Sequence, residues 1–400
     1  MQLIIRKRYV DLILNYLGKG LIIVLTGQRR VGKSCILQCV ERHIMQHEKE
    51  ANIISINKEY AEFSNIKYDS DLNEFINNRL KTDNKNYLFI DEVQDISGFE
   101  NSLRNFHAKG SCDIVVTGSN AKMLSGELAT YLSGRYIEVH IQSLDYREFL
   151  TFHNLQNSDE SLLKYLSFGG LPQLAHIGLD NHRMVTSYLN DIYNTVVMKD
   201  VISRESIRNV RFLNDLVRFV SDNIGKNISA NSISKFMKSQ NQTISPTLTA
   251  NYLRFLCNAY IINCSKRFDI HGKRLFETNE KYYFEDIGLR NSLIGINLRN
   301  DIEKLLENVV YLNLCANGYN VTIGQLLNGE IDFVAEKNGK CLYIQVCYLL
   351  STEETIEREF GNLRRIKDDF PKIVVCMDNL AANGNYQGIE CIHIRDFLMS

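Results

Sequence analysis

The chain lacks the features that would assign it to a membrane or secreted class. No apolar run approaches the ~20 residues that a bilayer crossing needs, and the densest one, residues 21–25, has the length of a strand. The first 17 residues carry charges inside their apolar stretch and offer no small-residue cleavage site, so they predict a helix and not a signal peptide. We therefore expect a cytoplasmic protein with no membrane partner.

Proline and paired cysteines are also scarce. The sequence holds only 3 prolines, so no proline-rich linker marks a domain boundary. Its 10 cysteines include no C-x-x-C pair, and most lie in apolar stretches, where cysteine behaves as a small hydrophobic residue. The spacing predicts reduced thiols in the core and no cysteine-bound metal.

The net charge of −1 conceals an uneven distribution. Residues 199–275 contain 13 Lys or Arg against 5 Asp or Glu, a local balance of +8. A basic middle segment in an otherwise acidic chain is typical of a nucleic-acid contact. DNA is therefore a candidate partner through residues 199–275.

Apolar strands alternate with amphipathic helices at the start of the chain. The predicted strands are 21–27, 52–57, 87–91, 112–118 and 136–141. The predicted helices between them are 34–47, 70–81, 99–109 and 121–132. Strands buried on both faces and separated by helices predict an α/β fold with a parallel sheet.

A complete phosphate-binding motif, G-x-x-x-x-G-K-[ST], follows the first predicted strand and opens the next helix. Its glycines let backbone N–H groups surround phosphate oxygens at a helix N-terminus. In this motif Lys33 reaches the β- and γ-phosphates, and the Ser34 hydroxyl is a Mg²⁺ ligand. The predicted nucleotide-binding residues are Gly27, Gln28, Arg29, Arg30, Val31, Gly32, Lys33, Ser34 and Cys35.

Two acids at the end of the third predicted strand complete this chemistry. Four apolar residues lead into Asp91, which we expect to hold the Mg²⁺ shell, and Glu92, which we expect to polarise the attacking water. Ser119 and Asn120, at the tip of the fourth strand, are candidates to sense the γ-phosphate, and Asn120 is slightly preferred. Arg135 offers a cation that could act in cis or from a neighbouring copy, or simply be solvated.

The sequence favours ATP over GTP, because no [NT]-K-x-D guanine-reading motif follows the loop. Beyond it, residues 142–200 have mainly helical patterns. Residues 209–284 predict three helices and then a strand pair, with a turn at 271–273, which is the order of a winged helix. The third helix would turn Thr247, Thr249, Asn251 and Arg254 outward. A further α/β unit follows residue 300.

Several segments resemble the AAA-domain ATPases often called archaeal-type ATPases. These are GQRRVGKS, LFIDEVQ, VTGSNAKML, LSGRYIEVHI, SLDYREF and FGGLPQ. Later segments, such as LENVVYLNL and EIDFVAE, are similar to the C-terminal domain of unknown function that many of them carry. The resemblance covers nearly the whole chain. It implies a P-loop ATPase domain (1–145), a helical connector (146–208), a winged-helix domain (209–285) and a restriction-endonuclease-like domain (286–400).

That last domain has altered nuclease residues. Its class places an acid on a helix, an Asp on one strand and Glu-x-Lys on the next, so that two carboxylates bind Mg²⁺. Glu307 and Asp332 fit the first two positions, but the third reads Gln345-Val346-Cys347. We therefore rank an active nuclease below a nuclease-shaped module that binds a partner or is structural. Three functions remain: a DNA-coupled ATPase, a slow ATP-dependent switch acting on proteins, and an ATP-regulated nuclease. A homo-oligomer is compatible with each.

Overall fold

The computed structural model describes residues 4–121, 132, 134–275, 279–379, 381–382 and 384–400. The chain forms two compact units. The first runs to Gln142 and includes Asn258–Tyr260, and the second contains Ser143–Cys257 and Ile261–Ser400. The first unit ends 3 residues before the boundary predicted at residue 145, and the three segments predicted after it fall in the second unit except for Asn258–Tyr260. Within the described part of the chain, no helix is both long and apolar enough to cross a membrane.

The first unit is a five-stranded parallel sheet in the order β2-β3-β4-β1-β5. Its strands are β1 (Ile22–Thr26), β2 (Asn52–Asn57), β3 (Asn86–Asp91), β4 (Asp113–Thr117) and β5 (Tyr136–His140). Its helices are α1 (Lys7–Tyr16), α2 (Lys33–His47), α3 (Asp69–Asn77) and α4 (Phe99–Lys109). This is the P-loop NTPase fold that the sequence predicted. The helix predicted over 121–132 lies almost wholly outside the described residues.

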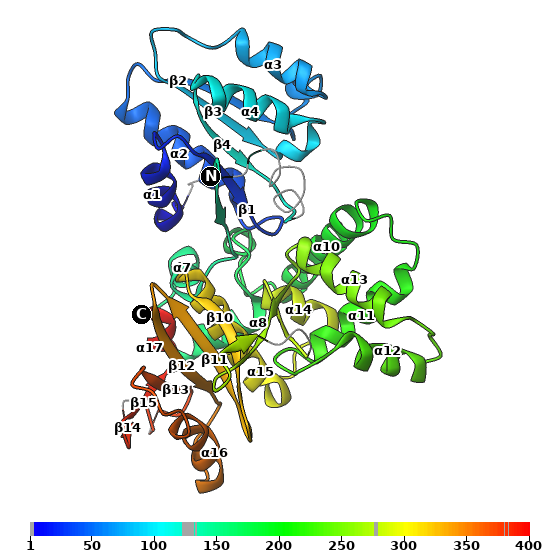
Figure 1. Cartoon of the computed structure of the whole chain (residues 1–400), viewed down its shortest axis with the longest axis vertical. Coiled ribbons are helices and arrows are strands. Elements are labelled where there is room, and N and C mark those ends of the chain that lie inside the picture. The colour runs from blue at the N-terminus through cyan, green and yellow to red at the C-terminus, as the bar shows by residue number, and fades with distance from the viewer. Residues whose placement is uncertain (1–3, 122–131, 133, 276–278, 380, 383) are drawn as a thin grey trace. The chain divides into compact units, whose positions relative to one another are not determined.

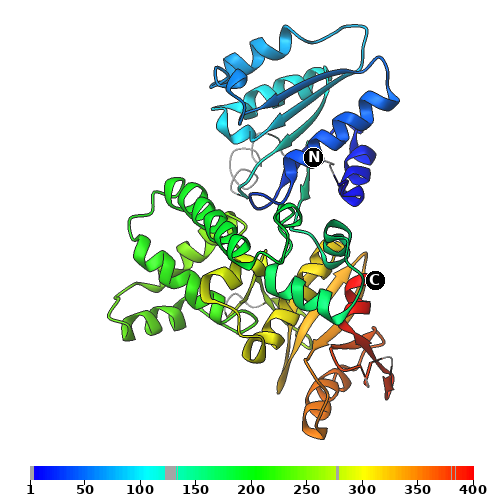
Figure 2. The same ribbon diagram turned by 180° about the vertical axis from the view of Figure 1, so that it is seen from behind.

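Helices cover both faces of this sheet, with α1 and α2 on one side and α3 and α4 on the other (Figures 1 and 2). The central strands β1 and β3 are buried along their whole length. Alternate residues of each strand point to opposite faces, so Val24 and Leu88 pack with Leu103 of α4 in one core. The arrangement brings the carboxyl ends of β1, β3 and β4 to one edge of the sheet.

The second unit begins with helices. They are α7 (Tyr146–His153), α8 (Asp159–Phe168), α9 (Leu174–Ile177), α10 (His182–Val196), a π-helical segment (Val197–Ser203), α11 (Val210–Asp222), α12 (Ala230–Ser239) and α13 (Pro246–Asn258). Serine and asparagine caps open several of them, such as Ser229 at α12, whose hydroxyl accepts from the N–H of Ser232. Helices α11–α13 lie where the sequence predicted three helices.

The predicted strand pair after these helices is different in the structure. Strand β6 (Ile262–Ser265) pairs with β9 (Lys281–Phe284). The intervening strands β7 (Arg267–Asp269) and β8 (Arg274–Leu275) join the C-terminal sheet, where β7 pairs with β10. The turn predicted at 271–273 therefore forms a hairpin, but its first strand is β7, and β7 joins the C-terminal sheet through β10.

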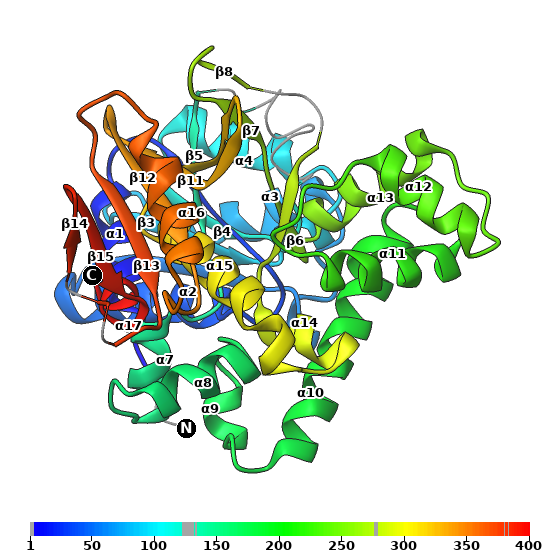
Figure 3. The same ribbon diagram turned by 90° about the horizontal axis from the view of Figure 1, so that it is seen from below.

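The C-terminal sheet has eight strands in the order β14-β15-β13-β12-β11-β10-β7-β8. Its later strands are β10 (Asn320–Leu326), β11 (Gly329–Lys337), β12 (Lys340–Val346), β13 (Lys372–Cys376), β14 (Asn385–Tyr386) and β15 (Ile389–His393). The accompanying helices are α14 (Ile287–Ile294), α15 (Leu298–Ala316), α16 (Glu353–Arg364) and α17 (Ile394–Met399). Helix α15 packs on β10–β12 and α16 on β11–β13 (Figure 3).

Candidate functional site

The loop between β1 and α2 adopts left-handed backbone conformations, which glycine favours. Gly27, Arg30 and Gly32 have φ values of 132°, 69° and 97°. A Cβ on Gly27 would lie 2.1 Å from the carbonyl oxygen of Ile141, so a side chain there would collide with backbone. The fully buried Val31 accepts a bond of 3.0 Å from Arg6, which the sequence did not single out. The loop is therefore held in one curved form.

Two side chains of this loop are buried within it. Nζ of Lys33, which is 5% exposed, donates to the carbonyl oxygens of Gly27 and Gln28 at 2.9 Å each. The amide of Gln28 is fully buried, and neither its oxygen nor its nitrogen has a hydrogen-bond partner among the described residues. A buried polar group without a partner destabilises the folded state by about 1–3 kcal/mol. A polar ligand that formed hydrogen bonds with the Gln28 amide would remove this cost.

Asp91, at the end of β3, lies in a hydrogen-bonded environment beside the loop. Its carboxylate accepts from Thr117 Oγ1 at 2.5 Å and from Asn57 Nδ2 at 3.2 Å. Burial raises the pKa of Asp91, although the hydroxyls of Thr117 and Ser34 and the ammonium of Lys33 oppose the shift. Thr117 was missed by the sequence reasoning, and its only signal was its place at a neighbouring strand end. Hydroxyl and carboxylate oxygens are the ligands that Mg²⁺ takes, so Ser34 and Asp91 fit that ion.

Glu92 follows in a left-handed conformation, with φ of 55°. Such backbone strain in a non-glycine residue is found at functional sites. Its N–H donates to Thr117 Oγ1 at 2.9 Å, and its carboxylate accepts from Gln94 and, at 3.4 Å, from Ser119. Arg29 lies 3.9 Å from the same carboxylate.

Of the remaining predicted residues, some lie at the site and others do not. Asn120 is buried beside Ser119, although the contact to Glu92 comes from Ser119. Cys35 is exposed on the first turn of α2. The structure does not bring Arg135 to the site. It precedes β5, which runs parallel to β1 with Tyr136 opposite Ile22, so it lies at the amino edge of the sheet. About 20 Å of strand separates that edge from the loop, and a role in cis is therefore excluded by geometry.

A second cluster of charged residues lies in the second unit. The ammonium of Lys281, on β9, lies 3.0 Å from Glu307 of α15, 2.6 Å from Glu330 and 3.8 Å from Asp332 of β11. The structure thus brings together Glu307 and Asp332, as the sequence predicted. It also supplies a lysine that no motif indicated, because β9 is distant in sequence from both.

A β-bulge positions Asp332. Between the pairs Thr322–Val334 and Gly324–Ile331, two residues of β11, one of them Asp332, lie opposite one of β10. The N–H of Asp332 donates to the side chain of Gln345 at 2.8 Å, and the Gln345 amide donates to Glu359 at 2.8 Å. Gln345 therefore serves as a neutral hydrogen-bonding bridge in the position where the nuclease pattern has a glutamate.

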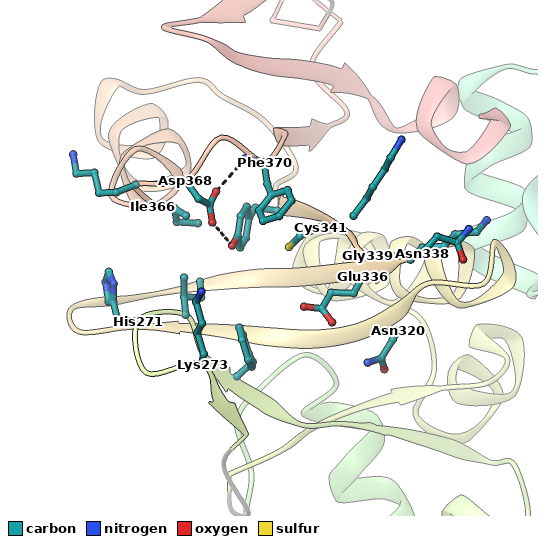
Figure 4. Close-up of a pocket in the computed structure, with 16 residues that line it drawn as sticks. His271, Lys273, Asn320, Glu336, Asn338, Gly339, Cys341, Ile366, Asp368 and Phe370 are labelled. Carbon is teal, nitrogen blue, oxygen red and sulfur yellow. Dashed lines mark hydrogen bonds between the residues drawn. The ribbon is translucent and has the colours of Figure 1, made fainter.

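A hollow of about 670 Å³ lies against β7, β11 and β12. Figure 4 shows His271 and Lys273 on one side and Asp368 with Phe370 on the other. Asp368 accepts from the hydroxyl of Tyr343 at 2.6 Å and pairs with Lys372. The other cations on its lining are Lys337, Lys340 and Lys367, against one further acid, Glu336. The hollow thus combines an excess of positive charge with exposed aromatic surface.

Comparisons with known proteins identify the family of the first unit and two relatives of the chain. Residues 19–150 match the model of the AAA domain family, and residues 159–300 match that of a domain of unknown function. An uncharacterized protein of Haemophilus influenzae is 32% identical over 403 residues, covering 99% of each chain. An uncharacterized protein of Methanocaldococcus jannaschii is 32% identical, covering 86% of this chain and 78% of its own.

Solved structures also match in part. A Walker-type ATPase of Pyrococcus abyssi is 16% identical and covers 72% of this chain and 93% of its own, with a TM-score of 0.46. AMPPCP-bound DnaA from Aquifex aeolicus is 18% identical and covers 62% of this chain and 86% of its own, with a TM-score of 0.33.

Proposed function

This chain belongs to the same family as the uncharacterized Haemophilus influenzae protein and carries an AAA-type P-loop domain, and on that premise we propose that it hydrolyses ATP with magnesium. The observation that carries the proposal is the convergence of the loop with Asp91 and Glu92 at one edge of the sheet. Phosphoryl transfer to water needs little more than positioning and electrostatics, which such a site supplies.

Each residue then has a definite part. Backbone N–H groups of Gly27–Ser34 surround the phosphates, and the ammonium of Lys33 moves from its loop carbonyls to the phosphate oxygens. Ser34 and Asp91 hold magnesium, which neutralises charge developing on the phosphates. Glu92 orients the attacking water, and Asn120 contacts the γ-phosphate. Arg135 acts only if a second copy of the chain brings it to a neighbouring site.

We further propose that the ATPase cycle is coupled to DNA through the basic segment 199–275, which lies almost wholly in the second unit. Lys235 and Lys238 are exposed on α12 and flank Phe236, which is 44% exposed. Ammonium groups bind phosphates, and exposed aromatic rings stack on bases of single strands. The hollow of Figure 4 repeats this combination at Lys340, Lys367 and Phe370. The DNA contact thus extends beyond the predicted segment 199–275.

The first experiment measures steady-state ATP hydrolysis by wild type and Glu92→Gln, each with and without DNA. We expect wild-type turnover to rise several-fold with DNA. Glu92→Gln should retain ATP binding and lose 10²-fold or more of turnover, because removing a positioned base typically costs that much. The matched control is Glu74→Gln, the same change at an exposed residue of α3, and Lys33→Ala should lose binding itself.

The outcomes separate the hypotheses. Wild-type rates in Glu92→Gln would overturn the assignment of that residue. Slow turnover that DNA does not change would exclude the coupling and favour the alternative, a nucleotide switch that acts on a protein partner. Turnover that survives in Lys33→Ala would place hydrolysis outside this loop.

A further inference from the structure

The carboxylate cluster of the second unit already contains a cation. Lys281 is 3% exposed, and three carboxylates surround its ammonium. Burial disfavours the charged form, but Glu307, Asp332 and Glu330 outweigh it and raise the pKa of Lys281. A buried ammonium of this kind is stable only because its partners are also held in place.

Protein donors satisfy most of the carboxylate oxygens in the cluster. Glu307 Oε1 also accepts from the hydroxyl of Tyr283 at 2.6 Å, and Glu330 Oε2 from Asn227 at 2.6 Å. Asp332 Oδ2 accepts from the N–H of Val346 at 2.9 Å. The oxygens that face the centre of the cluster are those that contact Lys281. A metal ion would have to compete for these oxygens with an ammonium tethered to the chain.

The residues also do not suit the ion that a nuclease of this class uses. Mg²⁺ requires oxygen ligands at about 2.0–2.1 Å in an octahedron. Within the described ranges, no group of three or more Asp, Glu, His or Cys side chains is arranged to hold a metal. The two acids that the resemblance implies are present, but the ammonium of Lys281 lies between them and Glu330.

We propose that the ammonium of Lys281 occupies the place of a divalent metal in this cluster, so that the second unit binds no Mg²⁺ there. The internal cation balances the charges of Glu307, Glu330 and Asp332 and ties β9 to α15 and β11. This goes beyond the ATPase, which lies in the other unit, and either proposal can fail without the other. It follows that removing the ammonium should create a divalent-cation site.

The test compares wild type with Lys281→Met, both free of nucleotide, by thermal unfolding in increasing Mn²⁺. We expect no saturable effect of Mn²⁺ on the second unit of the wild type. The Lys281→Met protein should unfold on the order of 10 °C lower, because it loses one partner of a buried ion cluster. Millimolar Mn²⁺ should restore several degrees by binding only the folded state.

Controls locate the effect. Lys281→Met/Glu307→Gln should lose the response to Mn²⁺. Lys304→Met, which removes a half-buried lysine paired with Asp301 on the same helix, should show no such response. If Lys281→Met does not fold, Lys281→Met/Glu330→Gln carries one acid fewer and should fold and bind Mn²⁺ through the remaining pair.

Three results would overturn the proposal. The first is saturable Mn²⁺ binding by wild type that Asp332→Asn abolishes. The second is Mg²⁺-dependent DNA cleavage by wild type that Asp332→Ala abolishes. The third is folded Lys281→Met, alone or with Glu330→Gln, that is indifferent to Mn²⁺.

Discussion

At the scale of single residues, burial makes two side chains important: Thr117 through its hydrogen bonds and His153 through its charge. Thr117 is fully buried, and one hydroxyl both donates to Asp91 and accepts from the N–H of Glu92. It thereby fixes the two acids relative to each other, although it touches no phosphate in the proposed mechanism. In His153, burial instead disfavours the charged form of the side chain.

The burial of His153 predicts that the folded protein loses stability in mild acid. Its ring packs against Phe149 at 4.3 Å, and burial lowers its pKa to about 4 from an ordinary 6.5. As pH falls from 6.5 towards 4, the unfolded chain takes up a proton that the folded chain refuses. The free energy of unfolding should therefore fall, by at most about 1.4 kcal/mol per pH unit.

Denaturant unfolding at several pH values tests this. The slope between pH 6.5 and 4 should become shallower in His153→Phe, which keeps the ring and removes the titration. His182 also lies against a phenylalanine, Phe168, but is exposed, so His182→Phe should leave the slope unchanged. Equal slopes in His153→Phe and wild type would disprove the assignment.

At the scale of elements, the ends of helices fix the loops that precede them. Asp286 is the N-cap of α14 and is 1% exposed. One of its oxygens accepts from the N–H of Leu289 at 3.0 Å, and the other accepts from that of Gly170 at 2.8 Å. A Cβ on Gly170 would lie 2.2 Å from the carbonyl oxygen of Leu144. The FGGLPQ segment is thus fixed between a helix cap and the backbone before α7.

Asp286→Ala should destabilise the second unit by about 2–4 kcal/mol, because it removes a cap and leaves the buried N–H of Gly170 without an acceptor. Urea unfolding followed by circular dichroism measures the loss. Asp145, the N-cap of α7, accepts from the N–H of Glu148 and is only half-buried, so Asp145→Ala should cost about 1 kcal/mol. Similar losses in the two variants would show that the bond to Gly170 contributes little.

Helix faces were harder to predict than helix positions. Helix α13 begins at Pro246, after the predicted capping serine, but Thr249 is buried and not outward as expected. Its hydroxyl donates to the carbonyl of Ser245 at 3.1 Å, so the polar group is satisfied within its own helix. A threonine can then take an inward position beside Tyr252 and Leu253, which residue polarity alone does not reveal.

At the scale of the whole molecule, two compact units predict two separate responses to ligands. A non-hydrolysable ATP analogue with Mg²⁺, at 100 times its Kd, should stabilise the first unit by about 2.7 kcal/mol, or roughly 5–10 °C. Calorimetry should show one transition that moves and one that stays. In Lys33→Ala neither should move. Equal shifts of both transitions in wild type would contradict independent units.

The two sites also show why one could be predicted and the other only in part. The nucleotide site draws on short contiguous segments, Gly27–Ser34 and Asp91–Glu92, whose chemistry a motif describes. The cluster around Lys281 joins β9 of the two-stranded sheet, helix α15 and β11 of the eight-stranded sheet, which are far apart in the sequence. Its two acids followed from a known pattern, but its cation did not. For Arg135 the opposite holds. The sequence suggested a role in cis, but it did not reveal that this residue lies at the amino edge of the sheet, away from the site.

The division of the chain has a consequence for its synthesis. The first unit includes Asn258–Tyr260, which follow the 115 residues of Ser143–Cys257. Asn258 accepts a hydrogen bond from the N–H of Ala121, and the ring of Tyr260 packs on His140 at 4.8 Å. At about 5–20 residues per second, a ribosome needs roughly 6–23 s to reach them. The five strands of the first unit must therefore wait for these last residues of their unit while most of the helices of the second unit emerge.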